Sequence, residues 1–145
     1  MRYNITILLL GGNDMGLFGK KDVWTVLFYE GEVPGFANDL PCDITLSDDA
    51  LRFEQKKTKT EILLPRERLI DLEILPHKDF TEKYKGNSSK QSGPKKTYYV
   101  FNYVNKNSEK TRIIFWLWNV DKNIFKMVDL RNRILKSSNQ QTYEL

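Results

Sequence analysis

Three strand-length runs of this chain carry large apolar side chains on both of their faces. The runs are residues 23–29, 97–104 and 111–118. Successive side chains of a β-strand point to opposite sides of the sheet, so a strand with one solvent-exposed face alternates apolar and polar residues. Here Tyr99 and Phe101 share one face, while Tyr98 and Val100 share the other. Both sides of such a sheet must be covered, either by the chain's own helix or N-terminal segment or by a partner protein.

Four further runs show the shorter alternation that is typical of half-buried strands. They are residues 42–46, 50–54, 60–64 and 69–75. Asp48 and Asp49 predict a tight turn between the first two, because short Asx side chains support turn backbones. The polar, lysine-rich residues 77–96 predict a long loop. An apolar stripe of helical period predicts a final helix over residues 120–136, and its members are Ile124, Met127, Val128, Ile134 and Leu135.

The predicted fold class is therefore mainly β with one C-terminal helix. Open sheets of this size leave unpaired edges, and a barrel or two packed sheets capped by the helix removes them. A chain of 145 residues is expected to form one domain. Its single cysteine, Cys42, excludes an internal disulfide and favours a reduced, cytoplasmic setting.

The first 21 residues read as a leader to the domain. The apolar run at residues 5–10 is shorter than a signal-peptide core and far short of the roughly 20 residues of a membrane span. Gly11-Gly12 can be encoded as a ribosome-binding sequence, which suggests that residues 1–14 come from a start codon placed too far upstream, with the true start at Met15. Alternatively, residues 3–10 add an eighth strand or cover an apolar face. Residues 137–145 have lost periodicity and are expected to fray.

The net charge of +4 is unevenly distributed. Residues 1–77 carry 9 basic and 13 acidic side chains, whereas residues 78–145 carry 14 and 6. Dense basic blocks of the kind that bind nucleic acid are missing from the sequence. Aromatic side chains near lysines could stack on single-stranded nucleic acid, but the intervening positions are too apolar to favour this.

The order of these segments resembles the bacterial PH-like domains of the pleckstrin-homology and GRAM-like superfold. The resemblance rests on CDITLSDDALRFEQ and TEILLPRERLIDLEIL, followed by a polar insert, YYVFNYV, RIIFWLW and a helix. It covers residues 22–136 and is a match of pattern and order. It implies a seven-stranded, strongly bent barrel of two near-orthogonal sheets, capped by helix 120–136. Because this superfold hosts phosphoinositide, phosphopeptide and protein binding, the fold alone does not specify a ligand.

The residue types that could carry catalysis each have a simpler structural explanation. Asp48 and Asp49 fit a hairpin turn better than a metal site, since no second acidic cluster accompanies them. His77 has no nucleophile beside it in the sequence, and Cys42 opens a half-buried strand. The glycines do not form a phosphate-binding loop. We therefore expect a non-enzymatic protein that needs neither a cofactor nor a metal.

Two surfaces are candidates for binding. The first is an aromatic surface for a protein partner or for self-association, formed by Tyr99, Tyr103, Trp116 and Trp118. The second is a site for an anionic lipid headgroup on lysine-bearing loops, formed by Lys56, Lys57, Lys59, Lys106 and Lys110. In PH-like domains these loops and the first loop surround one open end. Here the first loop is acidic, with Glu30, Glu32 and Asp39, which favours the protein-binding interpretation.

Overall fold

The computed structural model describes residues 22–86 and 95–138. Seven strands are present: β2 (Val23–Gly31), β3 (Pro41–Leu46), β4 (Ala50–Gln55), β5 (Thr60–Pro65), β6 (Leu69–Pro76), β7 (Lys96–Val104) and β8 (Lys110–Trp118). The C-terminal helix α2 spans Asp121–Ser138. The expected strands and helix are thus confirmed, with ends that shift by one or two residues. The predictions for residues 1–21, for residues 87–94 of the polar loop and for residues 139–145 lie outside the described residues.

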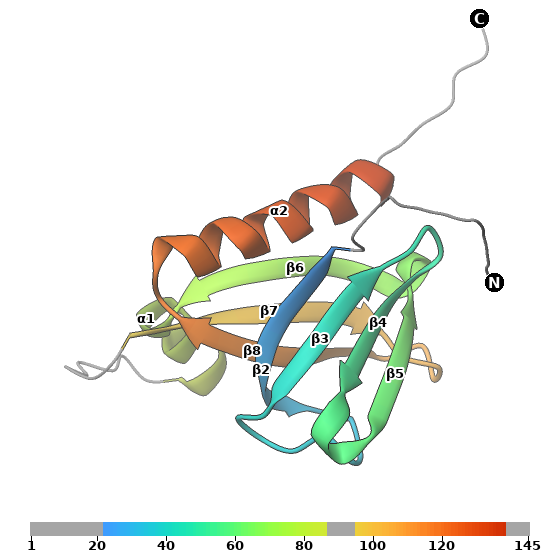
Figure 1. The fold of residues 1–145 in the computed structure, drawn as a ribbon, viewed down its shortest axis with the longest axis horizontal. Helices are drawn as coiled ribbons and strands as arrows, with labels where there is room; N and C mark the ends of the chain where they lie inside the picture. Colours follow the sequence, from blue (N-terminus) through green and yellow to red (C-terminus); the bar gives the residue numbers. More distant parts are fainter. Residues whose placement is uncertain (1–21, 87–94, 139–145) are drawn as a thin grey trace, which may run out of the picture.

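The strands form one antiparallel sheet in the order β5-β4-β3-β2-β8-β7-β6. Within the described residues, β5 and β6 are the two ends of this order, so the sheet is not closed into the barrel that we expected. A bulge between Phe28 and Glu30 interrupts the pairing of β2 with β8, and bulges bend a sheet. Figure 1 shows β6, β7 and β8 running across the direction of β2 to β5. The result is a strongly bent open sheet with α2 lying along its concave side.

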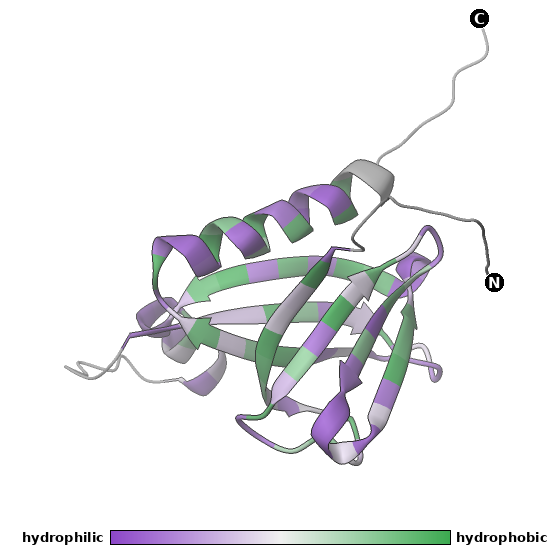
Figure 2. Ribbon diagram, in the orientation of Figure 1, coloured by the Kyte–Doolittle hydropathy of each residue, from purple (hydrophilic) through white to green (hydrophobic). Residues whose placement is uncertain are grey.

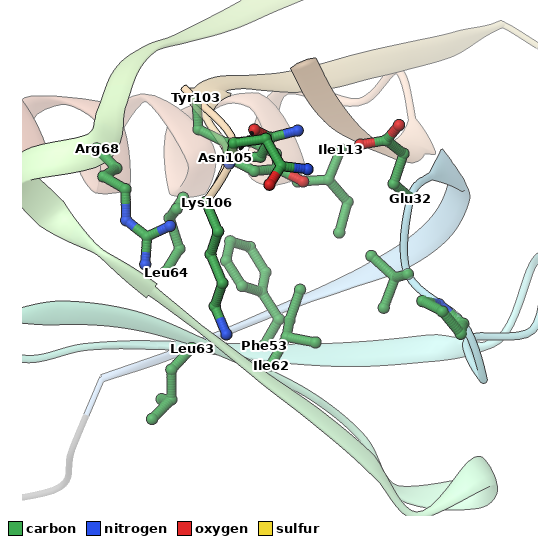
Figure 3. A pocket seen from close by; sticks show the side chains of 13 residues that line it. Glu32, Phe53, Ile62, Leu63, Leu64, Arg68, Tyr103, Asn105, Lys106 and Ile113 are labelled. Atoms are coloured by element: carbon green, nitrogen blue, oxygen red, sulfur yellow. Dashed lines mark hydrogen bonds between the residues drawn. The ribbon is translucent and has the colours of Figure 1, made fainter. Parts of the chain in front are cut away.

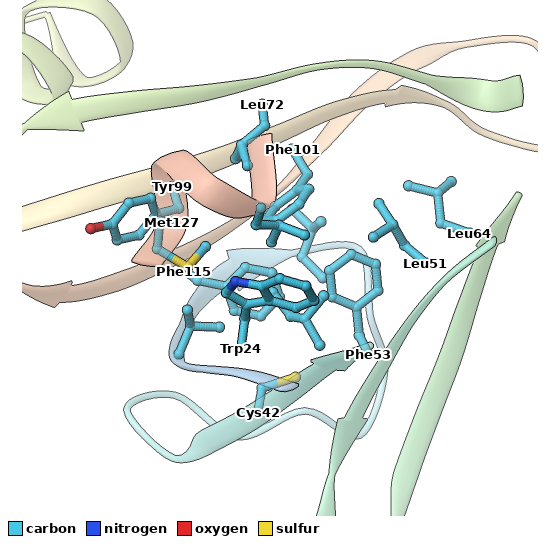
Figure 4. Close-up of a cluster of buried hydrophobic side chains, with 14 of the residues drawn as sticks. Trp24, Cys42, Leu51, Phe53, Leu64, Leu72, Tyr99, Phe101, Phe115 and Met127 are labelled. Atoms are coloured by element: carbon cyan, nitrogen blue, oxygen red, sulfur yellow. The ribbon is translucent and has the colours of Figure 1, made fainter. Parts of the chain in front are cut away.

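The concave face carries the main core. Phe53 lies at its centre, stacked on Phe115 with ring centroids 5.5 Å apart and edge-on to Phe101 at 5.3 Å (Figure 4). Helix α2 contributes three buried side chains to this core: Met127, Leu130 and Ile134. The indole N–H of Trp24 donates to the carbonyl of Lys126 at 3.0 Å and ties the helix to β2. Figure 2 shows the matching alternation of hydrophobic and hydrophilic residues along α2.

The sequence pattern misplaced two leucines of α2. Leu130 is buried although the predicted stripe omits it, whereas Leu135 is 41% exposed. The period of 3.6 residues places positions 127, 130 and 134 on one line, and Leu135 lies about 100° further round. No helix of the described residues is long and apolar enough to cross a bilayer.

A second apolar layer covers the convex face. The segment predicted as a loop begins instead with α1 (His77–Phe80) and a π-helical turn, η5 (Thr81–Lys85). Phe80 is buried and stacks on Tyr98, with ring centroids 4.0 Å apart. The cluster also holds Val100, Ile114 and Trp116. The polar composition concealed this element, because its large apolar contacts with the sheet come from two residues one helical turn apart, Phe80 and Tyr84.

Glu73 on β6 binds the turn η5 to the sheet. Its carboxylate accepts hydrogen bonds from Lys83 Nζ, from the Tyr84 hydroxyl and from Asn102 Nδ2. Burial disfavours the charged carboxylate, but the hydrogen bonds from these residues and the charge of Lys83 outweigh that effect and lower the pKa of Glu73. The turn η5 is therefore held by a charged network at its end and by Phe80 at its start.

Replacing Phe80 should test the convex layer. Phe80→Ala is expected to lower the free energy of unfolding by about 3 kcal/mol, because it removes a buried, stacked ring and leaves a cavity. Phe125→Ala is the matched control, since Phe125 lies on α2 with 69% of its surface exposed. It should change stability by less than about 0.5 kcal/mol. Urea denaturation followed by circular dichroism measures both, and equal effects would contradict the assigned layer.

The Glu73 network should make stability depend on pH. Its pKa is lower in the folded protein than in the unfolded chain, so its contribution is present above the unfolded value and is lost as pH falls through the folded one. The stability deficit of Glu73→Gln relative to wild type should thus be largest above about pH 5 and should narrow in more acidic solution. Glu82→Gln, an exposed position on the same turn, is the control. A deficit independent of pH would refute the assignment.

Candidate functional site

The structure separates the four aromatic residues of the predicted partner surface. Tyr99 and Tyr103 face the concave core, and Tyr99 is fully buried there. Trp116 and Trp118 point to the convex side, where Trp116 is buried in the second cluster. Trp118 alone of the four is exposed, at 44%. The four residues therefore do not form one surface, because the two tyrosines and the two tryptophans lie on opposite sides of the sheet.

One hydrogen bond and two ring contacts hold Trp116 in place. Its indole N–H donates to Asp39 Oδ1 at 2.9 Å, and the Lys96 ammonium lies 4.1 Å from the centre of its ring. Trp118 packs edge-on against it, with centroids 4.9 Å apart. This part of the predicted surface serves to join β8 to the loop before β3 and to the start of β7.

The five lysines of the predicted headgroup site are also divided. Lys56, Lys57 and Lys59 gather at the turn η3 (Lys56–Thr58) and the residue after it. Lys106 and Lys110 belong to the β7–β8 hairpin, which Figure 1 shows on the other side of β5. The ammonium of Lys56 lies 3.6 Å from the Asp43 carboxylate. Of the five, Lys106 alone lines the cavity beside β5.

The candidate nucleophile and acid–base groups occupy structural positions. Cys42 is completely buried, and burial, together with the charges of Asp43 and Glu54, raises the pKa of its thiol to about 12. The Ser47 N–H donates to the Ala50 carbonyl across Asp48 and Asp49, which confirms the predicted turn. His77 opens α1 with its ring 5.8 Å from that of Tyr98. No group of three potential metal ligands occurs among the described residues.

A cavity of about 320 Å³ opens at the edge of the sheet, beside β5. Its floor is apolar and comes from Phe53, Leu64 and Ile113, all of them buried. Its wall includes Ile62 of β5 and Val33 of the loop after β2. Figure 3 shows Arg68 and Lys106 at the mouth and Leu63 pointing away from the cavity. The other lining residues are Glu32, Pro34, Tyr103, Asn105 and Asn107.

Local interactions make the wall of this cavity a preformed structure. The amide of buried Gln55 accepts from the Ala37 N–H at 2.7 Å and donates to the Ala37 carbonyl at 2.9 Å. Gly35, at a φ of +99°, approaches Thr60 so closely that a Cβ would lie 2.8 Å from its Oγ1. The loop that carries Val33 is thereby fixed against β5, because only glycine accepts this backbone conformation without strain.

The charges at the mouth are mostly cationic. Within the described residues, neither Arg68 nor Lys106 has a carboxylate within ion-pair distance, and Glu32 supplies one negative charge on the opposite wall. Burial, assisted by Glu32, raises the pKa of Tyr103 against the opposing effect of Arg68. An apolar floor beneath free cations can hold a group that is both apolar and acidic.

A second hollow of about 290 Å³ lies on the other side of Leu63, near the start of β2. Its two arginines are already paired: Arg52 with Glu61, and Arg133 with Asp22. They are therefore less available to a ligand than Arg68 and Lys106. We take the β5-edge cavity as the candidate site.

Sequence reasoning identified two lining residues of this site in advance, Tyr103 from the predicted partner surface and Lys106 from the predicted headgroup site. The alternation of Ile62 and Leu64 predicted one buried face of β5. The cavity itself joins residues of three distant segments, which no local pattern reveals. The sequence matches no protein-family model and no curated protein. The function must therefore be argued from the geometry of the site.

The thiol of Cys42 offers a direct test of the closed core. Because the thiolate is the reactive form, a buried thiol with a raised pKa should react with Ellman's reagent at pH 8 at least about tenfold more slowly than the same thiol in urea. The measurement is the absorbance of the released thionitrobenzoate with time. Comparable rates in both solutions would show that the concave core is open to reagents.

Proposed function

We propose that this protein is a non-enzymatic binding module of PH-like type, which takes a protein segment in the β5-edge cavity. The single observation that carries the proposal is the cavity itself, with its buried apolar floor and two cations at the mouth that have no carboxylate partner among the described residues. The PH-like assignment is supported by two antiparallel meanders, β2 to β5 and β6 to β8, joined through β2 and β8, with α2 packed on the concave face.

A binding role agrees with the chemistry of the described residues. The thiol of Cys42 is buried and protonated, and the Asp48-Asp49 pair is occupied in a turn. The cavity is of the size that holds a small ligand or one or two large side chains. Apolar pockets that receive an anchor side chain dominate the binding energy of many protein interfaces.

A protein ligand is favoured over a lipid headgroup by the distribution of charge. A headgroup phosphate needs several cations converging on one point. Here the five lysines lie in two groups on different turns, and Lys56 has an acidic neighbour. The cavity mouth combines two cations with Glu32 and opens onto an apolar floor, which suits a side chain better than a phosphate.

Filling the cavity should weaken binding. The probe is a displayed library of random dodecapeptides, from which the wild-type protein should enrich peptides with large apolar residues. Ile62→Trp places an indole in the cavity and should weaken binding of the synthesised peptides at least about tenfold. Ile70→Trp is the matched control, because Ile70 lies exposed on the other edge strand, β6, outside the cavity lining.

Binding of the enriched peptides is measured by fluorescence anisotropy, with circular dichroism to confirm that each variant is folded. Failure to enrich any peptide would overturn the proposed function. So would peptides that bind Ile62→Trp as tightly as they bind wild type. Binding to phosphatidylserine vesicles that is lost in Lys57→Glu and kept in Ile62→Trp would instead support the lipid alternative.

A further inference from the structure

The free edge of β5 exposes backbone groups at known positions. The Ser47 N–H donates to the Ala50 carbonyl, so this pair is a hydrogen-bonded pair of the β3–β4 ladder. Such pairs alternate along antiparallel strands, so Arg52 and Glu54 also bond to β3, and the intervening residues of β4 turn their backbone groups to β5.

The β4–β5 register carries this alternation to the edge strand. Leu51 pairs with Leu64 and Phe53 with Ile62, so the backbone N–H and C=O groups of Ile62 and Leu64 hydrogen-bond to β4. Glu61 and Leu63 lie between these pairs, and their N–H and C=O groups therefore point away from the sheet. Within the described residues no strand pairs with them.

The same edge borders the cavity. Ile62 and Leu64 line it, whereas the side chain of Leu63, which is 63% exposed, points away from it (Figure 3). A strand added along β5 would continue the pleat, so alternate side chains of that strand would lie on the same face as Ile62 and Leu64. Those side chains would stand over the apolar floor of the cavity.

The charges around the cavity indicate which kind of strand could pair with β5. Glu61 already pairs with Arg52 on β4, whereas Arg68 and Lys106 have no carboxylate partner among the described residues. Both cations lie at the mouth of the cavity (Figure 3). Residues two positions before or after the inserted side chain would share its face and could reach them. Carboxylates bonded to Arg or Lys are among the stronger polar contacts of interfaces.

We infer that the partner is an extended acidic protein segment that adds as a strand to β5. Its backbone pairs with Glu61 and Leu63, one apolar side chain enters the cavity, and flanking Asp or Glu residues reach Arg68 and Lys106. This inference rests on the proposed function and specifies the mode of recognition and the chemistry of the partner. Strand addition of this kind draws affinity from main-chain hydrogen bonds and specificity from pockets for alternate side chains.

The decisive variant removes one outward hydrogen-bond donor. Leu63→Pro deletes an N–H that β4 does not use, and proline is tolerated on an edge strand where its nitrogen faces solvent. Leu63→Ala is the matched control, since it shortens the side chain and keeps the N–H. Affinity for the enriched dodecapeptides should fall at least about tenfold in Leu63→Pro and change less than about threefold in Leu63→Ala.

Charge reversal tests the acidic character of the partner. Arg68→Glu and Lys106→Glu should each weaken the synthesised peptides about tenfold, and raised salt should weaken their binding to wild type. Lys57→Glu reverses a lysine of the turn η3, outside the cavity, and should leave affinity unchanged. Enriched peptides without Asp or Glu, or peptides insensitive to both reversals, would overturn the acidic partner.

The remaining outcomes separate this inference from the proposed function. If Leu63→Pro binds like wild type while Ile62→Trp does not, strand addition is refuted and the cavity remains a binding site. If Ile62→Trp also binds like wild type, the proposed function fails. A wild-type dimer in light scattering that Leu63→Pro converts to monomer would replace the acidic partner by a second copy of this chain. Should Leu63→Pro unfold, amide exchange at Glu61 and Leu63 of wild type decides, because strand addition must slow both.

Discussion

Strand β8 imposes the main constraint on this molecule, because it lies inside the sheet with an apolar row on each side. Ile113 and Phe115 face the concave core, whereas Ile114 and Trp116 face the convex side. Burying apolar surface stabilises the folded protein by about 25 cal/mol per Å², and this stabilisation would be lost for either row if it stayed in water. The fold therefore needs two covering layers. Helix α2 supplies the first, and the short elements α1 and η5 supply the second.

Polar contacts attach each of the two covering layers to the sheet. Trp24 connects α2 to β2 through the Lys126 carbonyl, and the guanidinium of Arg66 reaches the carbonyl of Ile134 near the other end of the helix. Glu73 holds the turn η5 through three hydrogen bonds. Apolar burial thus provides the driving force, while polar contacts at the margins determine where each layer lies on the sheet.

The bent sheet leaves part of its concave core accessible beside β5. Strands β5 and β6 end the order of the described strands, and the cavity lies where β5 meets the β7–β8 hairpin. Edge strands with exposed apolar residues readily pair with other chains unless they are protected. Pro65 and the ion pair of Glu61 give β5 limited protection, but Leu63 stays exposed beside backbone groups that no described strand pairs with. The chain's own elements α1 and η5 pack on the aromatic convex face. The β5 edge is therefore the more accessible of the two surfaces for a binding partner.

The sequence by itself determined the strands, the final helix and the division of side chains between faces, since these follow from local periods of two and 3.6 residues. It placed Tyr99 and Tyr98 on opposite faces, as the structure does. It did not show that Phe80 covers Tyr98, because two aromatic residues within a polar segment give no period. Nor did it show the cavity, whose floor and mouth unite Phe53, Leu64 and Lys106 from different strands and turns. Only the tertiary structure decided those points, because covering layers and cavities depend on how the sheet bends and which edges stay open.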